Sequence, residues 1–508
     1  MLKKRTLAAV LLAALSATLP ALSPAMEAAP LSAPATAAAR HALDTYPDQV
    51  KASLARMVSF NTVADPAVPA EKNPQHQGFK QFLKEEAERL GFDYRDHGMV
   101  VVIGYGASED RVGIITHGDV QPVNPAKWAK SPFELDATSE PGRLVARGAE
   151  DDKGPIATAL YAMKAIKDQK VPLRRRLELY VYMAEESDWA PLEAFLKDHN
   201  PPQLNITLDA EYPVVTAEKG WGLVAVTIPA MPAKNAGKEP EVREFSGGYF
   251  ASQIPEDASA VIGNATRALE AQIKKRGAAQ KGMRYQTTWQ GKDLKVTALG
   301  LSAHSSKPEE GVNAIAMLAD ALKVRPWRTT SAGAMVDFIN DMVGTGIVGE
   351  RFGKVAYRDA FMGPMTVAPT VLAQKVGSME LTINLRRPRG KGKAELTAQF
   401  QQAFDQWKRL HAPQARIRME IGEPWVQTDA PQVPLLLDVF SHYTGIARAR
   451  PVSIGGGTNS RLFPKAVAFG PAMPGVAYTG HSEHEFITQQ QLLLNLQMYT
   501  AALVELAR

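Results

Sequence analysis

The chain of 508 residues contains no cysteine. Thiol nucleophiles, disulfide bonds and cysteine-ligated zinc sites are therefore excluded. Any metal ion would have to be held by histidine, aspartate and glutamate side chains. The net charge is also small, +5, and three of the positive charges (Lys3, Lys4 and Arg5) lie in the first few residues. Because no basic stripe with interleaved aromatic residues is present, we expect no nucleic-acid partner.

Long hydrophobic runs are missing as well, apart from one at the start. The opening segment MLKKRTLAAVLLAALSATLPALSPA has a basic beginning, an apolar middle and small residues near Ala25, which is typical of a secretory signal peptide. An uncleaved membrane anchor is the alternative, but Ser16, Thr18 and Pro20 interrupt the apolar middle. We therefore expect residues 1–25 to be a signal peptide. After its cleavage we expect no stable membrane anchor and a location in the periplasm, with full secretion as the alternative.

The rest of the chain predicts two domains, one inserted into the other. Residues 26–42 are rich in alanine and proline and are expected to form a flexible lead. From residue 43 to 220, buried strands alternate with amphipathic helices, which indicates an α/β sheet. The pattern changes over residues 221–422, and the α/β character returns over 423–508. We expect an α/β catalytic domain, with a mixed sheet flanked by helices, that is formed by both flanking segments. The middle segment is expected to form an α+β lid domain.

Polar residues that could ligate a metal or take part in catalysis follow the predicted strands of the first segment. The string THGDV places His117 and Asp119 at a strand end, where residues two apart share a face. One of them can ligate a metal while the other holds the ligating side chain in position. The alternative interpretation of this string is a plain strand-end turn without a metal. The string RGAEDDKGP places Asp151 just before a helix that begins with proline, where an N-cap carboxylate is the alternative.

Two adjacent carboxylates, Glu185 and Glu186, end the strand YVYMAEE. Their repulsion is unfavourable unless a positive charge lies nearby or one of them keeps its proton. A metal centre would divide the work between them, with Glu186 as a ligand and Glu185 as the base for a water molecule. Asp209 in TLDAE ends another strand, and His481 appears much later in GHSEHEF. Each of these residues taken alone fits an ordinary structural role.

The motifs in this order resemble one family, the zinc-dependent aminoacylase/carnosinase/dipeptidase metallopeptidases, and most closely the bacterial PepV-type dipeptidases. The likeness runs from about Leu43 to the end of the chain. It implies a pair of divalent metal ions, with zinc as the default and Mn²⁺ or Co²⁺ as alternatives. It implies His117, Asp151 and Asp209 as ligands of one ion, and Asp151, Glu186 and His481 as ligands of the other. It also implies a cis peptide bond after Asp151.

The same resemblance implies the remaining roles. Glu185 would be the general base and then the general acid, and Asp119 would orient His117. In the lid, LGLSAHSSKPEEG implies that His304 stabilises the transition-state oxyanion. The lid string Asn384-Leu385-Arg386-Arg387-Pro388 implies that Arg386 binds the C-terminal carboxylate of the substrate. Loop residues expected near that carboxylate are Gly456, Gly457 and Thr458.

The function that we expect is hydrolysis of dipeptides with a free C-terminal carboxylate, with a small peptide as the binding partner. An N-acyl amino acid deacylase or a glutamate carboxypeptidase with the same metal centre is the alternative, because those substrates also end in a carboxylate. A binding protein without catalysis is a further alternative that the complete set of ligands disfavours. The long inserted lid resembles that of monomeric family members, so a monomer is favoured over a homodimer.

Overall fold

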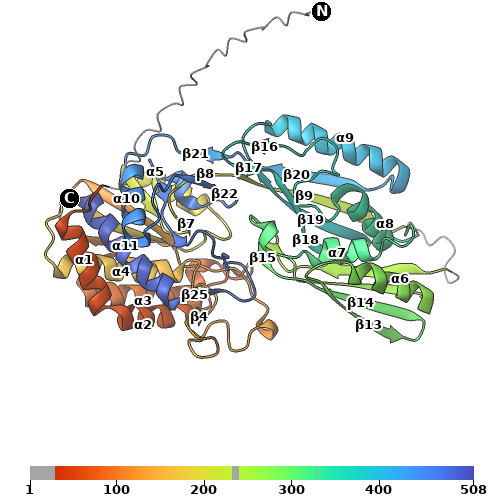
Figure 1. The fold of residues 1–508 in the computed structure, drawn as a ribbon, viewed down its shortest axis with the longest axis horizontal. Coiled ribbons are helices and arrows are strands. Elements are labelled where there is room, and N and C mark those ends of the chain that lie inside the picture. Colours follow the sequence, from red (N-terminus) through yellow and green to blue (C-terminus); the bar gives the residue numbers. More distant parts are fainter. Residues whose placement is uncertain (1–28, 232–238, 328) are drawn as a thin grey trace, which may run out of the picture.

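The computed structural model describes residues 29–231, 239–327 and 329–508, which form two domains that lie side by side (Figure 1). The predicted signal peptide, residues 1–25, lies outside the described residues. Among the described helices, none combines the length and the apolar character that crossing a bilayer requires.

The sheet of the first domain is mixed, as the alternating pattern predicts. Three neighbouring strands, β5 (Arg176–Tyr182), β3 (Arg111–His117) and β6 (Leu204–Thr207), run parallel. Strand β2 (Val100–Tyr105) pairs antiparallel with β5, and the edge strand β1 (Asp93–Asp96) pairs antiparallel with β2. The strands in spatial order are β1 (Asp93–Asp96), β2 (Val100–Tyr105), β5 (Arg176–Tyr182), β3 (Arg111–His117), β6 (Leu204–Thr207), β23 (Val467–Ala468), β8 (Val215–Glu218) and β21 (Trp425–Val426), with β22 (Val452–Ile454) also paired to β8.

Helices cover both faces of this sheet, because its strands are apolar on both sides. Leu179 and Val181 of β5 face one core, and Tyr180 and Tyr182 face the other. The larger core is built with α1 (Ala33–Thr45), α2 (Pro47–Val58), α3 (Pro74–Leu90), α4 (Lys153–Asp168), α10 (Val433–Thr444) and α11 (Gln489–Ala507). The smaller core is covered by α5 (Ala190–Asp198). Gly91 ends α3 in the left-handed conformation, which glycine adopts without steric cost.

The prediction of a flexible lead at residues 26–42 is wrong for its described part. Helix α1 begins at Ala33, with the Ser32 hydroxyl accepting a hydrogen bond from the Ala35 amide. Its alanines recur at helical spacing and are fully buried against α4 and α11: Ala35, Ala38, Ala39 and Ala42. The composition resembled a linker, but small residues allow close helix packing, so this segment belongs to the core of the catalytic domain.

The sheet of the second domain is antiparallel. Its first residue in the sequence is Gly220 and its last is Ile421, compared with predicted bounds of 221–422 for the lid. Its strands in spatial order are β13 (Arg284–Gln290), β14 (Asp293–Leu299), β12 (Asp257–Gly263), β10 (Glu241–Gly247), β18 (Thr366–Lys375), β19 (Ser378–Arg387), β9 (Gly220–Pro229) and β20 (Arg416–Ile421). One face packs on α6 (Arg267–Ala278), α7 (Ala314–Ala321), α8 (Ser331–Phe338), the π-helical turn η4 (Ile339–Val343) and α9 (Lys393–His411).

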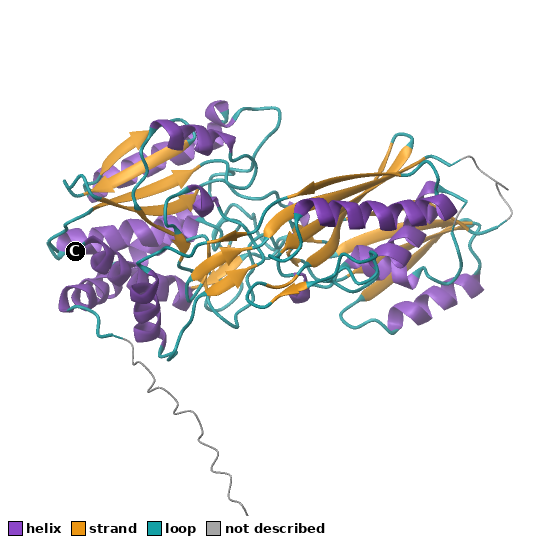
Figure 2. Ribbon diagram, turned by 90° about the horizontal axis from the view of Figure 1, so that it is seen from above, coloured by secondary structure: helices purple, strands orange, loops and turns teal. Residues whose placement is uncertain are grey.

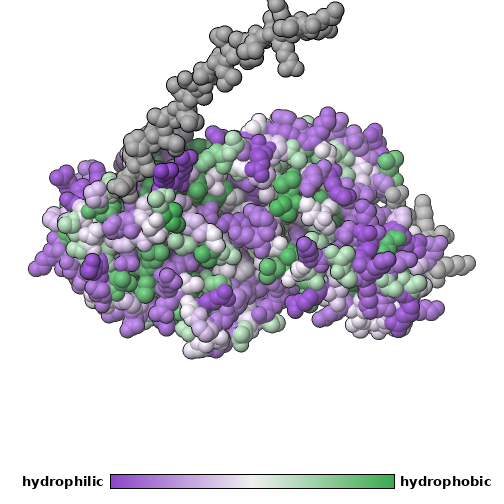
Figure 3. Space-filling view, in the orientation of Figure 1, coloured by the Kyte–Doolittle hydropathy of each residue, from purple (hydrophilic) through white to green (hydrophobic). Residues whose placement is uncertain are grey.

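Short elements and loops gather between the two domains (Figure 2). Small two-stranded sheets are formed by β4 (Arg143–Val145) with β25 (Phe486–Thr488), β7 (Ala210–Glu211) with β24 (Pro471–Ala472), β11 (Gln253–Ile254) with β15 (Ala303–His304), and β16 (Arg358–Asp359) with β17 (Gly363–Pro364). Single 3₁₀ turns are η1 (Ala70–Lys72), η2 (Pro125–Lys127), η3 (Pro308–Glu310) and η5 (Asn459–Leu462). On the face shown in Figure 3 hydrophobic residues are scattered among hydrophilic ones.

Candidate metal centre

The parallel strands of the first sheet bring most of the predicted metal ligands to one edge. Strand β3 ends at His117, Glu186 follows the end of β5, and Asp209 follows the end of β6. Parallel neighbours have their carboxyl ends at the same edge of a sheet, where open α/β folds bind ligands. Asp151 reaches this edge from the loop before α4, and His481 from the loop before β25.

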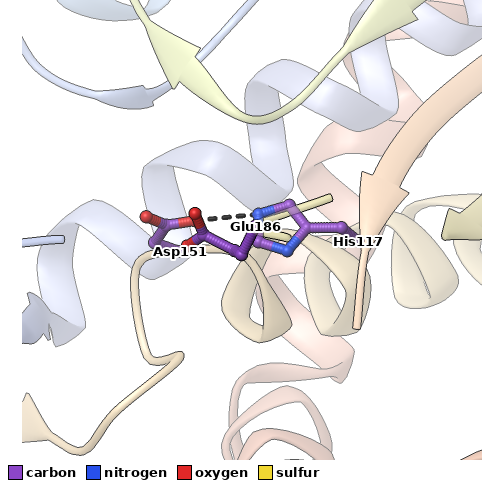
Figure 4. Close-up of side chains that lie close together, drawn as sticks. All are labelled: His117, Asp151 and Glu186. Carbon is purple, nitrogen blue, oxygen red and sulfur yellow. Dashed lines mark hydrogen bonds and ion pairs between the residues drawn. The ribbon is translucent and has the colours of Figure 1, made fainter. Parts of the chain in front are cut away.

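Asp151 lies at the middle of the cluster and faces both histidines. His117 Nε2 is 2.9 Å from Asp151 Oδ1, a contact drawn as a dashed line in Figure 4, and 3.6 Å from Asp209 Oδ1. On the other side, His481 Nε2 is 2.8 Å from Glu186 Oε1 and 3.3 Å from Asp151 Oδ2. Each imidazole thus forms one group with two carboxylates, and Asp151 contributes one oxygen atom to each group. The five predicted ligands come together in the arrangement that the resemblance implies.

The electrostatics of the cluster favour a bound cation. Burial opposes protonation of His481, but the carboxylates of Glu186 and Asp151 raise its pKa to about 10. Burial also opposes protonation of His117, yet the charge of Asp209 and the neighbouring aspartates raise its pKa well above the usual range. Buried carboxylates therefore draw positive charge onto both rings. Neutral imidazole and carboxylate are the donors that zinc and similar divalent ions take. Among the described residues, ligand atoms lie within 4.8 Å of one another in two groups, His117 with Asp151 and Glu186, and His117 with Glu185 and Asp209, so the donor types fit such ions although these groups differ from the predicted ligand sets.

Asp119 holds the adjacent glutamates rather than only His117. Its two carboxylate oxygens accept hydrogen bonds from the backbone amides of Glu185 and Glu186, each at 3.0 Å. The His117 Nδ1 atom lies 3.0 Å from the Asp119 carbonyl oxygen and 3.5 Å from its carboxylate. The prediction that Asp119 orients His117 therefore names the right residue, but the backbone carbonyl makes the closer contact. The side chain fixes the strand-end turn that carries Glu185 and Glu186.

Glu185 lies beside the ligands and bonds to the opposite loop. Its Oε1 atom accepts a hydrogen bond from the Asn459 amide at 3.1 Å. Burial, and then the negative charge of Asp209, raise the pKa of Glu185 well above its usual range. The carboxylate of Glu186 instead contacts His481 and the side-chain amide of Gln121, the latter at 2.8 Å. The two neighbouring acids thus have different surroundings, as their predicted roles require.

The loop of Asp151 is fixed by residues to which sequence reasoning gave no role. The buried carboxylate of Glu485 accepts hydrogen bonds from the amides of Gly148, Glu150 and Asp151 and pairs with Arg147 at 2.8 Å. The motif that contains His481 also contains Glu485, which was the available signal. The peptide bond between Asp151 and Asp152 is cis, as the resemblance implies.

Tyr478 was missed altogether. Its partly buried hydroxyl donates to Asp151 Oδ2 at 2.7 Å, and its ring lies 5.8 Å from the His304 ring, measured between centroids. Nothing in the local pattern marks this tyrosine, because its partner Asp151 is 327 positions away. It completes the wall of the site on the side of the lid.

The lid places His304 against the predicted ligand His481 of the same chain. The ring centroids of His304 and His481 are 4.2 Å apart. Burial and the neighbouring His481 lower the pKa of His304 well below its usual range, so the ring is neutral. Its Nδ1 atom accepts a hydrogen bond from the Ser306 amide at 3.0 Å. The proton of the neutral ring is therefore on Nε2, which leaves a donor for an oxygen atom in the site.

Arg386 is a buried cation whose hydrogen bonds go to neutral groups. It donates to the Asn384 side chain at 3.0 Å and to the Ser305 hydroxyl at 2.9 Å. Burial and the nearby Arg461 lower its pKa to about 9, so it remains charged at neutral pH. Arg461 is paired with Glu218 at 2.7 Å, and Arg387 with Glu423. Of these three arginines, Arg386 is the one suited to an incoming carboxylate.

The glycine-rich loop approaches the lid closely. A Cβ atom at Gly455 would lie 2.3 Å from the Ser306 carbonyl oxygen, so a side chain there would displace the lid. Gly456 and Gly457 line the site. The hydroxyl of Thr458 donates to the Glu218 carboxylate at 2.7 Å and so anchors the loop, and Thr458 also lines the site.

Two cavities meet at the cluster. The larger one, about 680 Å³, is lined by Arg386, Arg461, Trp189, Trp221 and Phe250 among others. The smaller one, about 70 Å³, extends past Asp209 to Glu211, Lys307 and Tyr478. The residues that line both are Glu185, Glu186, His304, Gly457 and His481. A substrate that spans the cluster would thus have one half in each cavity.

A protein-family model described as Peptidase family M20/M25/M40 matches residues 113–505. The chain belongs to this family. It is therefore an enzyme, a metallopeptidase, and the family predicted from the motifs is confirmed. The members of this family generally bind two divalent metal ions.

Individual relatives agree with this assignment. A protein of Bacillus subtilis (strain 168) named "Putative dipeptidase YtjP" is 30% identical over 464 residues, which cover 88% of this chain and 95% of that protein. A relative from Staphylococcus haemolyticus (strain JCSC1435), whose name also describes a dipeptidase, is 28% identical over 479 residues, covering 92% of this chain and 99% of the relative.

Solved structures share the fold at low sequence identity. Human carnosine dipeptidase 1 superposes with a TM-score of 0.57 over 94% of this chain and 99% of that chain, at 14% identity. The di-peptidase Dug1p from Saccharomyces cerevisiae gives a TM-score of 0.56 over 93% and 98%, also at 14% identity. The predicted fold, a catalytic α/β domain with an inserted lid, is thus confirmed.

Proposed function

We propose that this chain is a dipeptidase with two divalent metal ions that hydrolyses dipeptides with a free C-terminal carboxylate. One observation carries the proposal: the lid residues His304 and Arg386 line the same cavity as Glu185 and the ligand His481. The cavity therefore offers a base, an oxyanion donor and a carboxylate anchor around one point. The dipeptidase names of the relatives support the same substrate class.

The five predicted ligands would divide between two ions, with Asp151 shared. His117, Asp151 and Asp209 would hold one ion, and Asp151, Glu186 and His481 the other. When bound, such ions lower the pKa of a water molecule and polarise a carbonyl group. Zinc is the ion proposed first, because two imidazoles and three carboxylates suit it; Mn²⁺ and Co²⁺ suit the same donors.

The chain's own residues perform the proton transfers and the positioning. Glu185 accepts a proton from the attacking water and then passes it to the departing amine. The Nε2–H group of His304 donates to the substrate oxygen as negative charge develops there, a contribution typically worth about 3–4 kcal/mol. Arg386 binds the terminal carboxylate and so fixes the scissile bond over the cluster.

Because His304 belongs to the same chain as the ligands, we propose that the active unit is a monomer. The lid contacts the catalytic domain directly, since the Gln253 side chain donates to the His481 carbonyl oxygen at 2.8 Å. This contact within one chain supports a monomeric active unit. Export to the periplasm, directed by residues 1–25, is also proposed, on the basis of the signal-like opening alone.

A panel of substrates tests the proposal. Purified enzyme is stripped with a chelator, reloaded with Zn²⁺, Mn²⁺ or Co²⁺, and assayed with dipeptides, tripeptides, N-acetyl amino acids and substrates that release a C-terminal glutamate. The proposal expects the highest kcat/KM for dipeptides. A higher value for N-acetyl amino acids or for release of a C-terminal glutamate would replace it with the corresponding deacylase or carboxypeptidase.

A further inference from the structure

A pair of opposite charges joins the two domains in the wall of the smaller cavity. Lys307 Nζ of the lid lies 2.8 Å from Glu211 Oε2 of the catalytic domain. Both side chains are about one-fifth exposed, at 21% each. Glu211 follows the ligand Asp209 by two residues, and Lys307 follows His304 by three. The pair therefore sits close to the reacting centre without belonging to the metal cluster.

The position of this pair relative to Arg386 gives the substrate a direction. Arg386 lines the larger cavity, whereas Glu211 and Lys307 line the smaller one. A dipeptide whose carboxylate is bound at Arg386 extends across the cluster and places its first residue in the smaller cavity. In a dipeptide that residue carries an α-ammonium group; in an N-acyl amino acid the corresponding group is uncharged.

We propose that Glu211 binds the α-ammonium group of the substrate, so that the site selects peptides with a free N-terminus over N-acyl amino acids. This inference rests on the proposed dipeptidase function and names the residue that would bind the N-terminal end of the substrate. A carboxylate–ammonium hydrogen bond is charge-assisted and strong where water is partly excluded. A neutral acyl group in the same place would leave Glu211 without that partner.

The surroundings of Glu211 can accommodate a second cation. Lys307 Nζ is also 3.8 Å from Glu310, so the lysine keeps a carboxylate partner when Glu211 turns to the substrate. The Tyr478 ring lines the same cavity, and Lys307 Nζ already lies 5.9 Å from its centroid. An aromatic face of this kind attracts ammonium groups.

The test compares two substrates that differ only in the amine, alanyl-alanine and propionyl-alanine. Glu211→Gln is expected to lower kcat/KM for alanyl-alanine at least tenfold and to change that for propionyl-alanine less than threefold. The matched control is Glu309→Gln, because Glu309 is an exposed carboxylate of the same lid segment that lies outside the cavity lining; both of its values should stay within twofold of wild type. Glu211→Asp, which keeps the charge, should retain the preference for the free amine.

Several outcomes would overturn the inference while leaving the dipeptidase function intact. One is an equal loss for both substrates in Glu211→Gln with unchanged metal content, which indicates a structural role. Another is a raised KM for both substrates in Lys307→Gln with none in Arg386→Ala, which places the substrate carboxylate at the lysine. If propionyl-alanine turnover is undetectable throughout, a loss below tenfold on alanyl-alanine overturns the inference. If the wild-type enzyme prefers propionyl-alanine, the proposed dipeptidase function itself is contradicted.

Discussion

The Nε2 atom of His481 lies 2.8 Å from Oε1 of Glu186, although the two residues are 295 positions apart. The whole inserted lid separates them in the sequence. His481 has a φ angle of +64°, in the left-handed region that few residues other than glycine adopt. The fold thus holds an unfavourable backbone conformation where it brings the late histidine to the early carboxylates, as is common at functional sites.

The first prediction concerns Glu185. Glu185→Gln keeps the size of the side chain and its position beside Asn459 but removes the base, so kcat for a dipeptide should fall by roughly 10²–10⁴. Metal content, measured by mass spectrometry of the protein-bound elements, should not change. The exposed Glu193 of α5 provides the control, since Glu193→Gln should leave kcat unaltered. Wild-type turnover in Glu185→Gln would remove this residue from the mechanism.

Arg386 should govern recognition of the substrate's carboxylate. Arg386→Ala is expected to raise KM and lower kcat for dipeptides, because the anchor fixes both binding and the position of the scissile bond. A dipeptide amide, which lacks the charge, should be hydrolysed equally by wild type and variant. Arg389→Ala, at a half-exposed arginine paired with Asp359, is the control. Unchanged kinetics on dipeptides would show that another group binds the carboxylate.

Glu485 should contribute mainly to stability and to the shape of the Asp151 loop. Glu485→Gln removes the charge that pairs with buried Arg147 and replaces one acceptor oxygen with a donor facing backbone amides. Breaking a buried pair costs roughly 3–5 kcal/mol of unfolding free energy. Denaturant unfolding measures this change, and Glu193→Gln at an exposed position of α5 is the comparison. A loss below 1 kcal/mol would mean that the loop holds its form without this carboxylate.

Helix α1 offers a prediction with a control on the same helix. Ala39 is fully buried against the catalytic core, whereas Ala37 is exposed. Ala39→Glu should therefore destabilise the protein by several kcal/mol through overpacking and burial of a charge, and Ala37→Glu should stay within about 0.5 kcal/mol of wild type. Thermal or denaturant unfolding compares the two. Equal stabilities would show that residues 33–45 are dispensable for the fold.

The sequence predicted the parts of the site that depend on order and local pattern. Each of His117, Glu186 and Asp209 follows or ends a strand. Parallel strands have their carboxyl ends at the same edge of the sheet, so the position of these residues in the sequence was enough to predict that they come together. The alternation of strands and helices gave the two-segment catalytic domain. His304 and Arg386 were found through the resemblance, because neither stands out by spacing.

Other features could not be predicted because they depend on distant partners. The hydroxyl of Tyr478 donates a hydrogen bond to Asp151, 327 positions earlier in the sequence. The carboxylate of Glu485 accepts hydrogen bonds from backbone amides of a loop more than 330 residues earlier. Asp119 illustrates a smaller error, since the residue was identified while the contact of its carboxylate with two backbone amides was not. The alanine-rich start of α1 was misread because composition alone does not distinguish a linker from a closely packed helix.

The most direct test of the central claim is a metal titration of the chelated enzyme with dipeptide hydrolysis and bound metal measured on the same samples. We expect no hydrolysis without metal and full recovery at two equivalents of ion per chain. Glu186→Gln and His481→Ala should each weaken the binding of one equivalent. Hydrolysis of dipeptides at the wild-type rate by the metal-free enzyme, or recovery complete at one equivalent, would contradict it.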